Sequence, residues 1–422
     1  MHPLLRIRGK VMSEKKNQVQ LKNYNRRTVL NYIRKHGTAT KAGLASVTGL
    51  TFMAIKKILE ELENLNLIRC DEMEGGNLGR KAVSYAINEN FRYTIGIHIN
   101  KFVTSIAVLN LCGEVIEVKR FSVPQENQSQ AAFMELLIEN IKEVIQKSEI
   151  PKEMFLGVGI GVPGPVDIKN GVVLTPPNIP ILNYLPLKEI LEARLECKVY
   201  VHKDTNVIAF AEYWFGEDKN AFDLTYIDVD MGIGSGSIID GRINVGANCI
   251  AGEFGHITLD INGPLCNCGK KGCLEALSSG IAILRDLKDA VEKEPSHPLY
   301  EKKDHLKIED VFEMVEMKDL LTISILNKSA YYMGIAVANL INVMDPHRIV
   351  LGGILIQKYP RYFEIVQDVA NANKVKGATA TQMSVSYLKG NAGVIGAGEV
   401  VTERFFNEMV NEVFDGNGVL QV

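Results

Sequence analysis

A short stretch with one His and three Cys constrains the fold of this chain more than any other feature. Within residues 252–275 the spacing is H-x9-C-x-C-x4-C, formed by His256, Cys266, Cys268 and Cys273. One nitrogen and three sulfur ligands suit a tetrahedral zinc ion that has no coordination position left open. We therefore expect a structural zinc site that folds the loop around the metal, and not a zinc ion that activates water.

Packing cysteines and disulfides are the two alternatives to a metal site. Three of the seven Cys fall within eight residues and follow a His, which favours a shared ligand. We recognise no secretory signal at the start of the sequence, so we expect a cytoplasmic protein with reduced thiols. No apolar run reaches the roughly 18 residues that a membrane span needs, and we expect no membrane partner.

The motif also resembles a known family signature. The string GEFGH followed by CNCGKKGCLE is similar to the signature of the ROK family, which joins sugar kinases and sugar-responsive repressors. The resemblance implies that the zinc loop shapes a sugar pocket. It also implies that Glu253, His256 and Glu275 bind sugar hydroxyls, with His256 serving both metal and sugar. Carboxylates suit this role because each accepts hydrogen bonds from two adjacent hydroxyls.

Charge is distributed unevenly along the chain. Residues 1–60 hold thirteen Lys and Arg against two Glu, a net +11, which leaves −14 for the other 362 residues of a chain whose net charge is −3. A basic head on an acidic body indicates that the head meets a polyanion such as DNA. A solvated, lysine-rich tail is the alternative.

The pattern of residues 25–90 predicts a winged helix-turn-helix domain behind a flexible basic arm at residues 1–24. Three short helices are expected, with Thr40 capping the second and Thr51 the third, and a Gly turn at Gly49 between them. Short strands at 68–70 and 82–86 flank the stretch EGGNLGRK. This stretch resembles the wing of ROK repressors, although Lys81 stands where the family usually has Pro.

The start of the third helix is the expected DNA-reading surface. Lys56 and Lys57 can reach phosphate or guanine, and Phe52 can touch a thymine methyl group. The alternative is that Phe52 and Met53 pack against a partner domain. The full set of expected DNA-binding residues is Thr51, Phe52, Met53, Lys56, Lys57 and, in the wing, Arg80.

Residues 91–422 are expected to form a two-lobed α/β body, with the second lobe starting near residue 220. Strand-like runs at 93–99, 103–110, 114–122 and 155–162 surround a helix at about 130–148, and a similar order returns from 223 to 353. The resemblance, which covers residues 26 to about 405, implies the actin-like, hexokinase-type ATPase fold. Residues 391–401 are similar to the closing helix of the family.

Further sugar-site residues follow from the resemblance. PGPVD at 163–167 resembles a loop that borders the sugar, and Gly164 lets the backbone approach a ligand closely. Asp204 corresponds to the general base of family kinases, and Asn206 to a nearby family Asn. Lys203 replaces another sugar-binding Asn. Its ammonium is expected to pair with Asp204, to attract an anionic ligand such as a sugar phosphate, or to point to solvent.

The phosphate-binding loops of a kinase are not retained. A family kinase has Asp-x-Gly-Gly-Thr after its first strand; here His98 stands in the Asp position and Phe102 in the hydroxyl position. In the second loop, Asp230 stands where it would repel a triphosphate. We therefore expect a regulator and not an enzyme. The alternatives are an ATP-dependent sugar kinase with an added DNA module, and a DNA-binding protein with a vestigial sugar pocket.

The expected mechanism couples sugar to operator DNA. Two-fold operators match two-fold proteins, and the resemblance implies a homodimer or homotetramer. Sugar or sugar phosphate binding would close the lobes and change the spacing of the DNA-binding domains, which releases double-stranded operator DNA. ROK repressors include members that respond to xylose, glucose or N-acetylglucosamine 6-phosphate, and Lys203 is the one residue here that bears on the choice.

Overall fold

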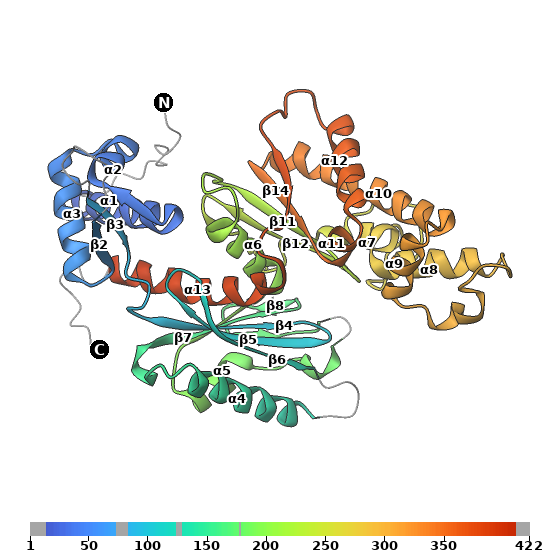
Figure 1. Ribbon diagram of the computed structural model, residues 1–422, viewed down its shortest axis with the longest axis horizontal. Helices are drawn as coiled ribbons and strands as arrows, with labels where there is room; N and C mark the ends of the chain where they lie inside the picture. The colour runs from blue at the N-terminus through green and yellow to red at the C-terminus, as the bar shows by residue number, and fades with distance from the viewer. Residues whose placement is uncertain (1–13, 73–82, 124–128, 177–178, 411–422) are drawn as a thin grey trace.

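The computed structural model describes residues 14–72, 83–123, 129–176 and 179–410. Figure 1 shows a small N-terminal domain (blue) beside two larger lobes, each built on a twisted sheet. Sheets of five strands form both lobes, and a sheet of three strands belongs to the N-terminal domain. The mixed α/β, two-lobed architecture expected from the sequence is confirmed.

The N-terminal domain is a helix-turn-helix with a small sheet. Its elements are α1 (Glu14–His36), β1 (Thr38–Thr40), α2 (Lys41–Thr48), α3 (Phe52–Asn64), β2 (Ile68–Glu72) and β3 (Val83–Ile87). Thr40 caps α2 and Thr51 caps α3 through their side-chain oxygens, as predicted. Gly49 ends α2 in the left-handed region at φ +70°, and the axes of α2 and α3 meet at 116°. This angle is typical of a DNA-binding helix-turn-helix.

Helix α1 begins inside the segment predicted as an irregular arm. The prediction is wrong for residues 14–24, which are helical, whereas residues 1–13 lie outside the described part of the chain. The second half of α1 buries Val29, Leu30 and Ile33. Because this burial stabilises the first helical turns, it offsets the unfavourable free energy of helix nucleation. Extension toward the N-terminus through good helix formers is then easy. In the first half of α1, Val19 and Leu21 are exposed. The sequence of this first half therefore lacks the regular spacing of buried apolar residues that predicts a helix.

The two lobes have sheets of the same topology. The first has strand order β10-β7-β4-β5-β6 and the second β13-β12-β11-β14-β15. In each, three strands form an antiparallel meander and two later strands add in parallel beside the first of them. The internal repeat expected from the sequence is therefore present.

The elements of the first lobe match the expected runs closely. They are β4 (Tyr93–Ile99), β5 (Val103–Asn110), β6 (Val115–Ser122), α4 (Gln130–Lys147), β7 (Phe155–Val162), β8 (Val166–Asp167), β9 (Val172–Val173), α5 (Leu187–Leu195) and β10 (Val199–Lys203). Helix α4 packs Phe133, Leu137, Ile141 and Val144 into the lobe core. This spacing of three or four residues is the period of a helix with one buried face.

The second lobe begins at Leu224 and is richer in helices. Its elements are β11 (Leu224–Val229), β12 (Ile233–Ile239), β13 (Arg242–Ile243), α7 (Leu274–Ser278), α8 (Gly280–Val291), α9 (Ile308–Glu316), α10 (Leu320–Met344), β14 (Arg348–Gly352), α11 (Ile354–Lys358), α12 (Pro360–Asn373) and β15 (Gln382–Val385). Helix α10 is long and apolar enough to meet a membrane-span criterion, with mean hydropathy 1.2. It packs Leu326, Met333 and Val337 into the lobe core, as a core helix does.

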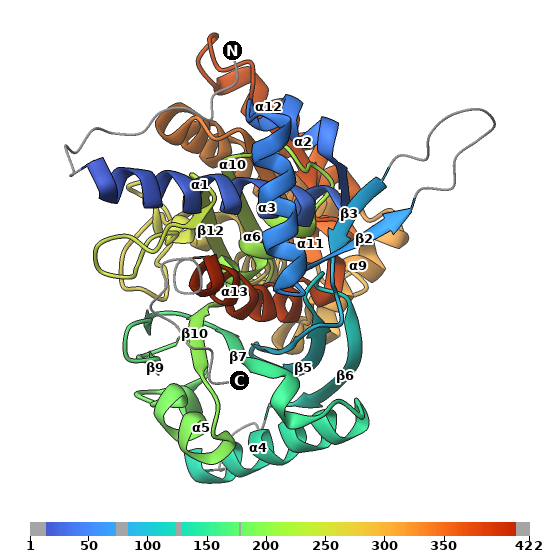
Figure 2. The same ribbon diagram turned by 90° about the vertical axis from the view of Figure 1, so that its left-hand side faces the viewer.

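Two helices connect the three parts of the molecule. Helix α6 (Asp204–Phe215) packs against β12 of the second lobe, and α13 (Ala392–Glu408) runs along the first-lobe sheet toward the N-terminal domain (Figures 1 and 2). Their crossing needs Gly396, because a Cβ there would lie 1.7 Å from the Val207 carbonyl oxygen. At the end of α13, Phe406 and Met409 join the hydrophobic core of the N-terminal domain.

Candidate functional site

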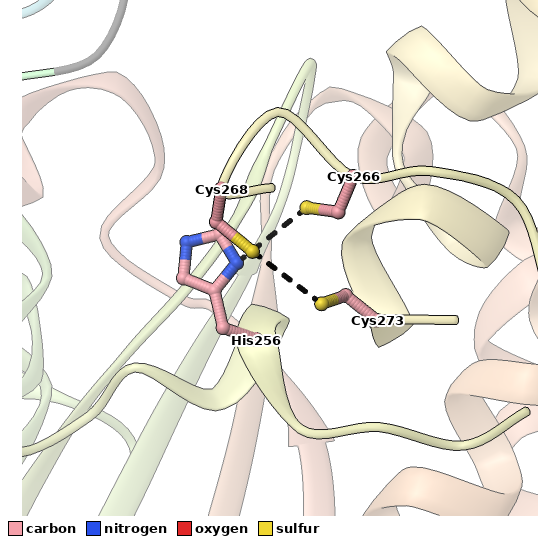
Figure 3. A group of neighbouring side chains, drawn as sticks. All are labelled: His256, Cys266, Cys268 and Cys273. Carbon is pink, nitrogen blue, oxygen red and sulfur yellow. Dashed lines mark hydrogen bonds between the residues drawn. The ribbon is translucent and has the colours of Figure 1, made fainter. Parts of the chain in front are cut away.

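The four side chains of the expected metal site come together in the loop after β13. Their candidate ligand atoms all lie within 4.8 Å of one another, and Figure 3 shows the ring and the three thiols clustered around one point. Cys266 Sγ lies 3.7 Å from His256 Nδ1, and Cys268 Sγ lies 3.6 Å from Cys273 Sγ. All seven Cys lie in the described residues and are free thiols, so the disulfide alternative is wrong.

These distances fit a tetrahedral metal ion. Zinc–sulfur bonds of about 2.3 Å and zinc–nitrogen bonds of about 2.0 Å give tetrahedron edges of roughly 3.5–3.8 Å, close to the two measured separations. His256 lies in the single turn of 3-10 helix formed by Phe254–His256. Its Nε2 faces Glu253 Oε2 at 3.8 Å, which leaves Nδ1 for the metal. A carboxylate beside the second nitrogen of a ligating His orients the ring.

Two backbone segments approach each other closely within residues 256–273, which carry the four candidate ligands and are called the metal loop below. Gly272 has φ +67°, and a Cβ there would lie 1.4 Å from the Asp260 carbonyl oxygen. The segments also meet through a bridge between Thr258 and Cys273. A residue with a side chain at position 272 would therefore force apart the strands that present the cysteines.

Lys203 and Glu253 form an ion pair at the centre of the expected sugar site. Lys203 Nζ donates to Glu253 Oε1 at 2.6 Å and to the Gly252 carbonyl at 3.2 Å. Lys203 is only 9% exposed, so the prediction that it points to solvent is wrong. Its hydrogen-bonded partner is Glu253, and not Asp204 as one expectation had it. Sequence reasoning missed this pair because the two residues come from separate lobes.

Asp204 is the first residue of α6 and directly follows Lys203 in the chain. Its Oδ1 accepts a hydrogen bond from the Thr205 backbone N–H at 2.6 Å. Burial raises the pKa of Asp204 to about 6, and the neighbouring Lys203 ammonium opposes that rise. A carboxyl group with a pKa so close to neutrality can accept or donate a hydrogen bond to a hydroxyl.

Glu275 joins the metal loop to the second phosphate loop. Its Oε2 accepts a hydrogen bond from the Ile233 backbone N–H at 3.0 Å, and its Oε1 lies 4.0 Å from Cys266 Sγ. The carboxylate therefore follows any movement of the loop that carries the cysteines. Gly164 lies against Lys203 in space, since a Cβ on it would touch the Lys203 side chain at 3.4 Å, and Asn206, two residues after Asp204, is 3% exposed. Asn206 Oδ1 has no hydrogen-bond partner among the described residues.

The first phosphate loop is occupied by the protein's own side chains. Asn100 Oδ1 accepts hydrogen bonds from the backbone N–H groups of Phe102 and Val103, at 2.9 and 2.8 Å. A phosphate bound by this loop would need free backbone N–H donors of this kind. His98 is partly buried, its ring lies against Gly393 of α13, and desolvation lowers its pKa to about 4. It is therefore a neutral packing residue at neutral pH.

The second phosphate loop is occupied in the same way. Asp230 Oδ1 accepts a hydrogen bond from the Met231 backbone N–H at 2.6 Å, and Glu275 already holds Ile233 N–H. Asp228, which is partly buried, stands two residues before Asp230, and desolvation together with the Asp230 charge raises the pKa of Asp228. In both loops, side-chain oxygens thus accept hydrogen bonds from backbone N–H groups that could otherwise bind an anion. The sequence showed only that Thr and Gly residues of the kinase motifs are replaced.

The expected DNA-reading residues lie on the exposed start of α3. Phe52 is 55% and Met53 71% exposed, and Lys56 and Lys57 are also exposed. The described part of the same chain therefore does not cover Phe52 and Met53, and their packing against a partner domain stays an alternative prediction. Thr51 caps the helix by accepting from the Ala54 backbone N–H. Arg80 lies outside the described residues.

Comparison with known proteins identifies the family. The ROK family pattern matches residues 94–404, which is most of the two-lobed body with its metal loop. The chain belongs to the ROK family. A xylose repressor from Bacillus spizizenii is 26% identical over 394 residues, covering 93% of this chain and 98% of the repressor.

Other ROK members differ in how much of this chain they cover. A glucokinase from Halalkalibacterium halodurans is 30% identical over 322 residues, 74% of this chain and 96% of the kinase. The solved structure of a ROK family transcriptional regulator, a homologue of the E. coli MLC protein, has a TM-score of 0.74 at 24% identity and covers 94% of this chain and all of that chain. The regulators therefore extend over the N-terminal domain, whereas the glucokinase matches a length close to that of the ROK body alone.

Proposed function

We propose that this ROK protein is a transcriptional repressor that binds operator DNA and leaves it when a sugar enters the site around Lys203 and Glu253. One observation carries the proposal: a helix-turn-helix with an exposed third helix stands beside a body in which the side chains expected to bind sugar lie together, while the loops expected to bind phosphate donate their backbone N–H groups to side chains. Similarity to xylose repressors along nearly the whole chain supports the same function. The active species would be a dimer or a tetramer, since paired domains match paired half-sites.

The protein would not phosphorylate its sugar. ATP needs free backbone donors around its phosphates, and here Asn100, Asp230 and Glu275 accept hydrogen bonds from those donors. A triphosphate would have to displace two carboxylates and then remain beside them. At about 4 Å, and with an effective dielectric constant near 20, each like-charge contact costs about 4 kcal/mol.

A zinc ion would serve structure in this protein. The His and three Cys suit zinc by ligand type and by spacing, and four protein ligands leave no position for substrate. The ion would hold the metal loop closed. In doing so it would place His256 and, through the Cys266 contact, Glu275 at the edge of the sugar site.

A neutral sugar fits the charges better than a sugar phosphate. The Lys203 ammonium is already bonded to Glu253 and the Lys270 ammonium to the His256 carbonyl, and Asp204 and Glu275 add two carboxyl groups to that of Glu253. A phosphate would therefore meet net negative charge. Glu253 remains 43% exposed and His256 28%, so both can reach an incoming hydroxyl. Xylose is the first candidate, because the repressors of Bacillus spizizenii and Caldicellulosiruptor bescii are named for it.

The test is fluorescence anisotropy with DNA from upstream of the gene, titrated with free and phosphorylated sugars. We expect a neutral sugar to weaken DNA binding by about 100-fold, within the usual range of allosteric coupling. Addition of Mg²⁺ and ATP should produce no sugar phosphate. If DNA binds but no sugar changes its affinity, the pocket is vestigial and the proposal fails. Sugar phosphate formation would instead support the kinase alternative.

A further inference from the structure

A buried arginine joins the N-terminal domain to the ROK body. Arg34, near the end of α1, donates to Glu399 and, at 2.8 Å, to Glu403, both on α13. Its side chain is 3% exposed and that of Glu399 is 1% exposed. The guanidinium also lies over the rings of Trp214 on α6 and Phe406 on α13, at 4.0 and 4.4 Å.

The contact on α6 leads directly to the sugar site. Asp204 is the first residue of α6 and Trp214 stands near its end, so one rigid helix has the sugar site at one end and Arg34 at the other. The next residue of α1, Lys35, also contacts α6. Its Nζ lies 3.5 Å from the centroid of the Tyr213 ring on α6 and donates a hydrogen bond to the Ala221 carbonyl at 3.1 Å.

The contact on α13 leads to the first lobe. Helix α13 crosses α6 at Gly396 and also lies against two strands of the first-lobe sheet. A Cβ atom on Gly159 of β7 would lie 1.8 Å from the Ala397 carbonyl oxygen of α13, and a Cβ atom on Gly96 of β4 would lie 2.0 Å from the Val394 carbonyl oxygen. No side chain separates these backbones, so α13 moves with the first lobe. Helix α6 packs against the second lobe through Thr205, whose carbonyl oxygen would lie 2.3 Å from a Cβ on Gly236.

Arg34 therefore contacts both helices at the point where the lobes meet the DNA-binding domain. Helices α6 and α13 pack backbone to backbone where Gly396 meets Val207, so a change in the angle between the lobes turns the two helices about this crossing and shifts the Trp214 end of α6 relative to α13. A buried guanidinium cannot lose its carboxylate partners without a large desolvation cost, so α1 must follow. Arg34 also differs from Arg26, another arginine of α1, which pairs with the partly exposed Glu61 of α3 inside the N-terminal domain.

We propose that Arg34 is the positioning residue that transmits sugar occupancy to the DNA-binding domain, through Trp214 on α6 and the carboxylate pair Glu399 and Glu403 on α13. The proposal rests on the function proposed above and assigns its coupling to one side chain. Arg34 would contact neither sugar nor DNA, and its effect would be on the coupling between the two.

The experiment compares Arg34→Met with Arg26→Met in the full-length protein. Calorimetry measures the sugar dissociation constant, with xylose as the first sugar used, and anisotropy measures the operator dissociation constant with and without saturating sugar. We expect Arg34→Met to bind sugar within about threefold of wild type, while the effect of sugar on operator affinity falls from about 100-fold to under about threefold. Arg26→Met should keep the wild-type ratio, because its ion pair does not cross to the body.

Two further variants keep the test decisive. Arg34→Lys should restore only part of the ratio, because an ammonium lacks the planar fork that bridges two carboxylates. If Arg34→Met does not fold by circular dichroism, Glu403→Gln takes its place, since the Glu403 side chain is 23% exposed and its loss is less disruptive; its ratio should fall at least fivefold.

The outcomes separate this inference from the proposed function. If wild type responds to sugar and Arg34→Met responds by the same ratio, the inference is wrong and the repressor function stands. Equal loss of the ratio in Arg34→Met and Arg26→Met would also overturn it, because the effect would then reflect stability of the domain. A wild-type protein without any sugar response would contradict the proposed function itself.

Discussion

The sugar half and the phosphate half of the site have diverged in opposite ways. In the sugar half, Lys203 comes from one lobe and Glu253 and His256 from the other, and they meet with exposed polar atoms still available. In the phosphate half, Asn100 and Asp230 turn back onto the amides of their own loops. One half keeps hydrogen-bonding capacity for a ligand, whereas the other uses that capacity internally.

This difference shows how a catalytic fold can become a sensor. Backbone amides of a loop bind phosphate only while no side chain accepts from them. A single Asx-type turn at Asn100 is enough to fill two of them, and it stabilises the hairpin at the same time. In the proposed function the lobes would respond to a sugar, while the filled amides of these two loops would oppose the binding of ATP.

The largest expected effect comes from the metal loop that supports the sugar half. Cys268→Ser should reduce bound zinc from about one ion per chain to none and weaken sugar binding by at least about 100-fold, because metal binding and loop folding are coupled. Metal analysis of the purified protein and calorimetry with sugar measure both. Cys70→Ser, at an exposed thiol outside the loop, is the control. Full sugar affinity without metal would contradict a structural zinc.

A smaller effect is expected within the sugar half itself. Glu253→Gln keeps the size of the side chain but removes the charge that strengthens its hydrogen bonds, a loss of about 1.5–3 kcal/mol. The sugar midpoint for operator release should therefore rise about 10- to 100-fold, which anisotropy measures. Glu313→Gln, on the exposed face of α9, should leave the midpoint where it is. An unchanged midpoint in Glu253→Gln would place the sugar elsewhere.

The smallest effect tests the packing role of the phosphate half. Because burial lowers the pKa of His98 to about 4 from an ordinary value near 6.5, its neutral ring stabilises the fold fully above pH 6.5. That contribution is lost as the pH falls toward 4, by about 2 kcal/mol at pH 5. Chemical denaturation should thus show the stability gap between wild type and His98→Gln narrowing by about this amount from pH 7 to pH 5. A constant gap would mean that His98 binds its proton equally readily in the folded and unfolded chain, and that its pKa is not lowered by the fold.

Sequence reasoning succeeded where a pattern is local. The run at 155–162 is a buried strand, Thr51 caps its helix, and the four metal residues cluster as their spacing predicted. Each of these depends on neighbours in the sequence or on a motif read as a unit. The two-lobed fold followed from the repeated order of such runs.

Pairs formed between distant segments could not be predicted in the same way. Lys203 meets Glu253 across 50 positions and Arg34 meets Glu399 across 365, and nothing in either local sequence marks the partner. The early start of α1 was also hidden, because an exposed helix extension has no apolar period. The turn at Asn100 was not predicted, because the loss of the glycine motif shows that phosphate binding is impaired but does not show which side chain accepts the hydrogen bonds instead of the phosphate.

The central claim is that sugar binding and operator binding oppose each other in one molecule, and calorimetry of the sugar with free protein and with operator-saturated protein tests it most directly. Linkage requires the operator to weaken sugar binding by the same factor by which sugar weakens operator binding. We predict a sugar dissociation constant about 100-fold higher in the presence of operator. Equal sugar affinity with and without DNA would contradict the account.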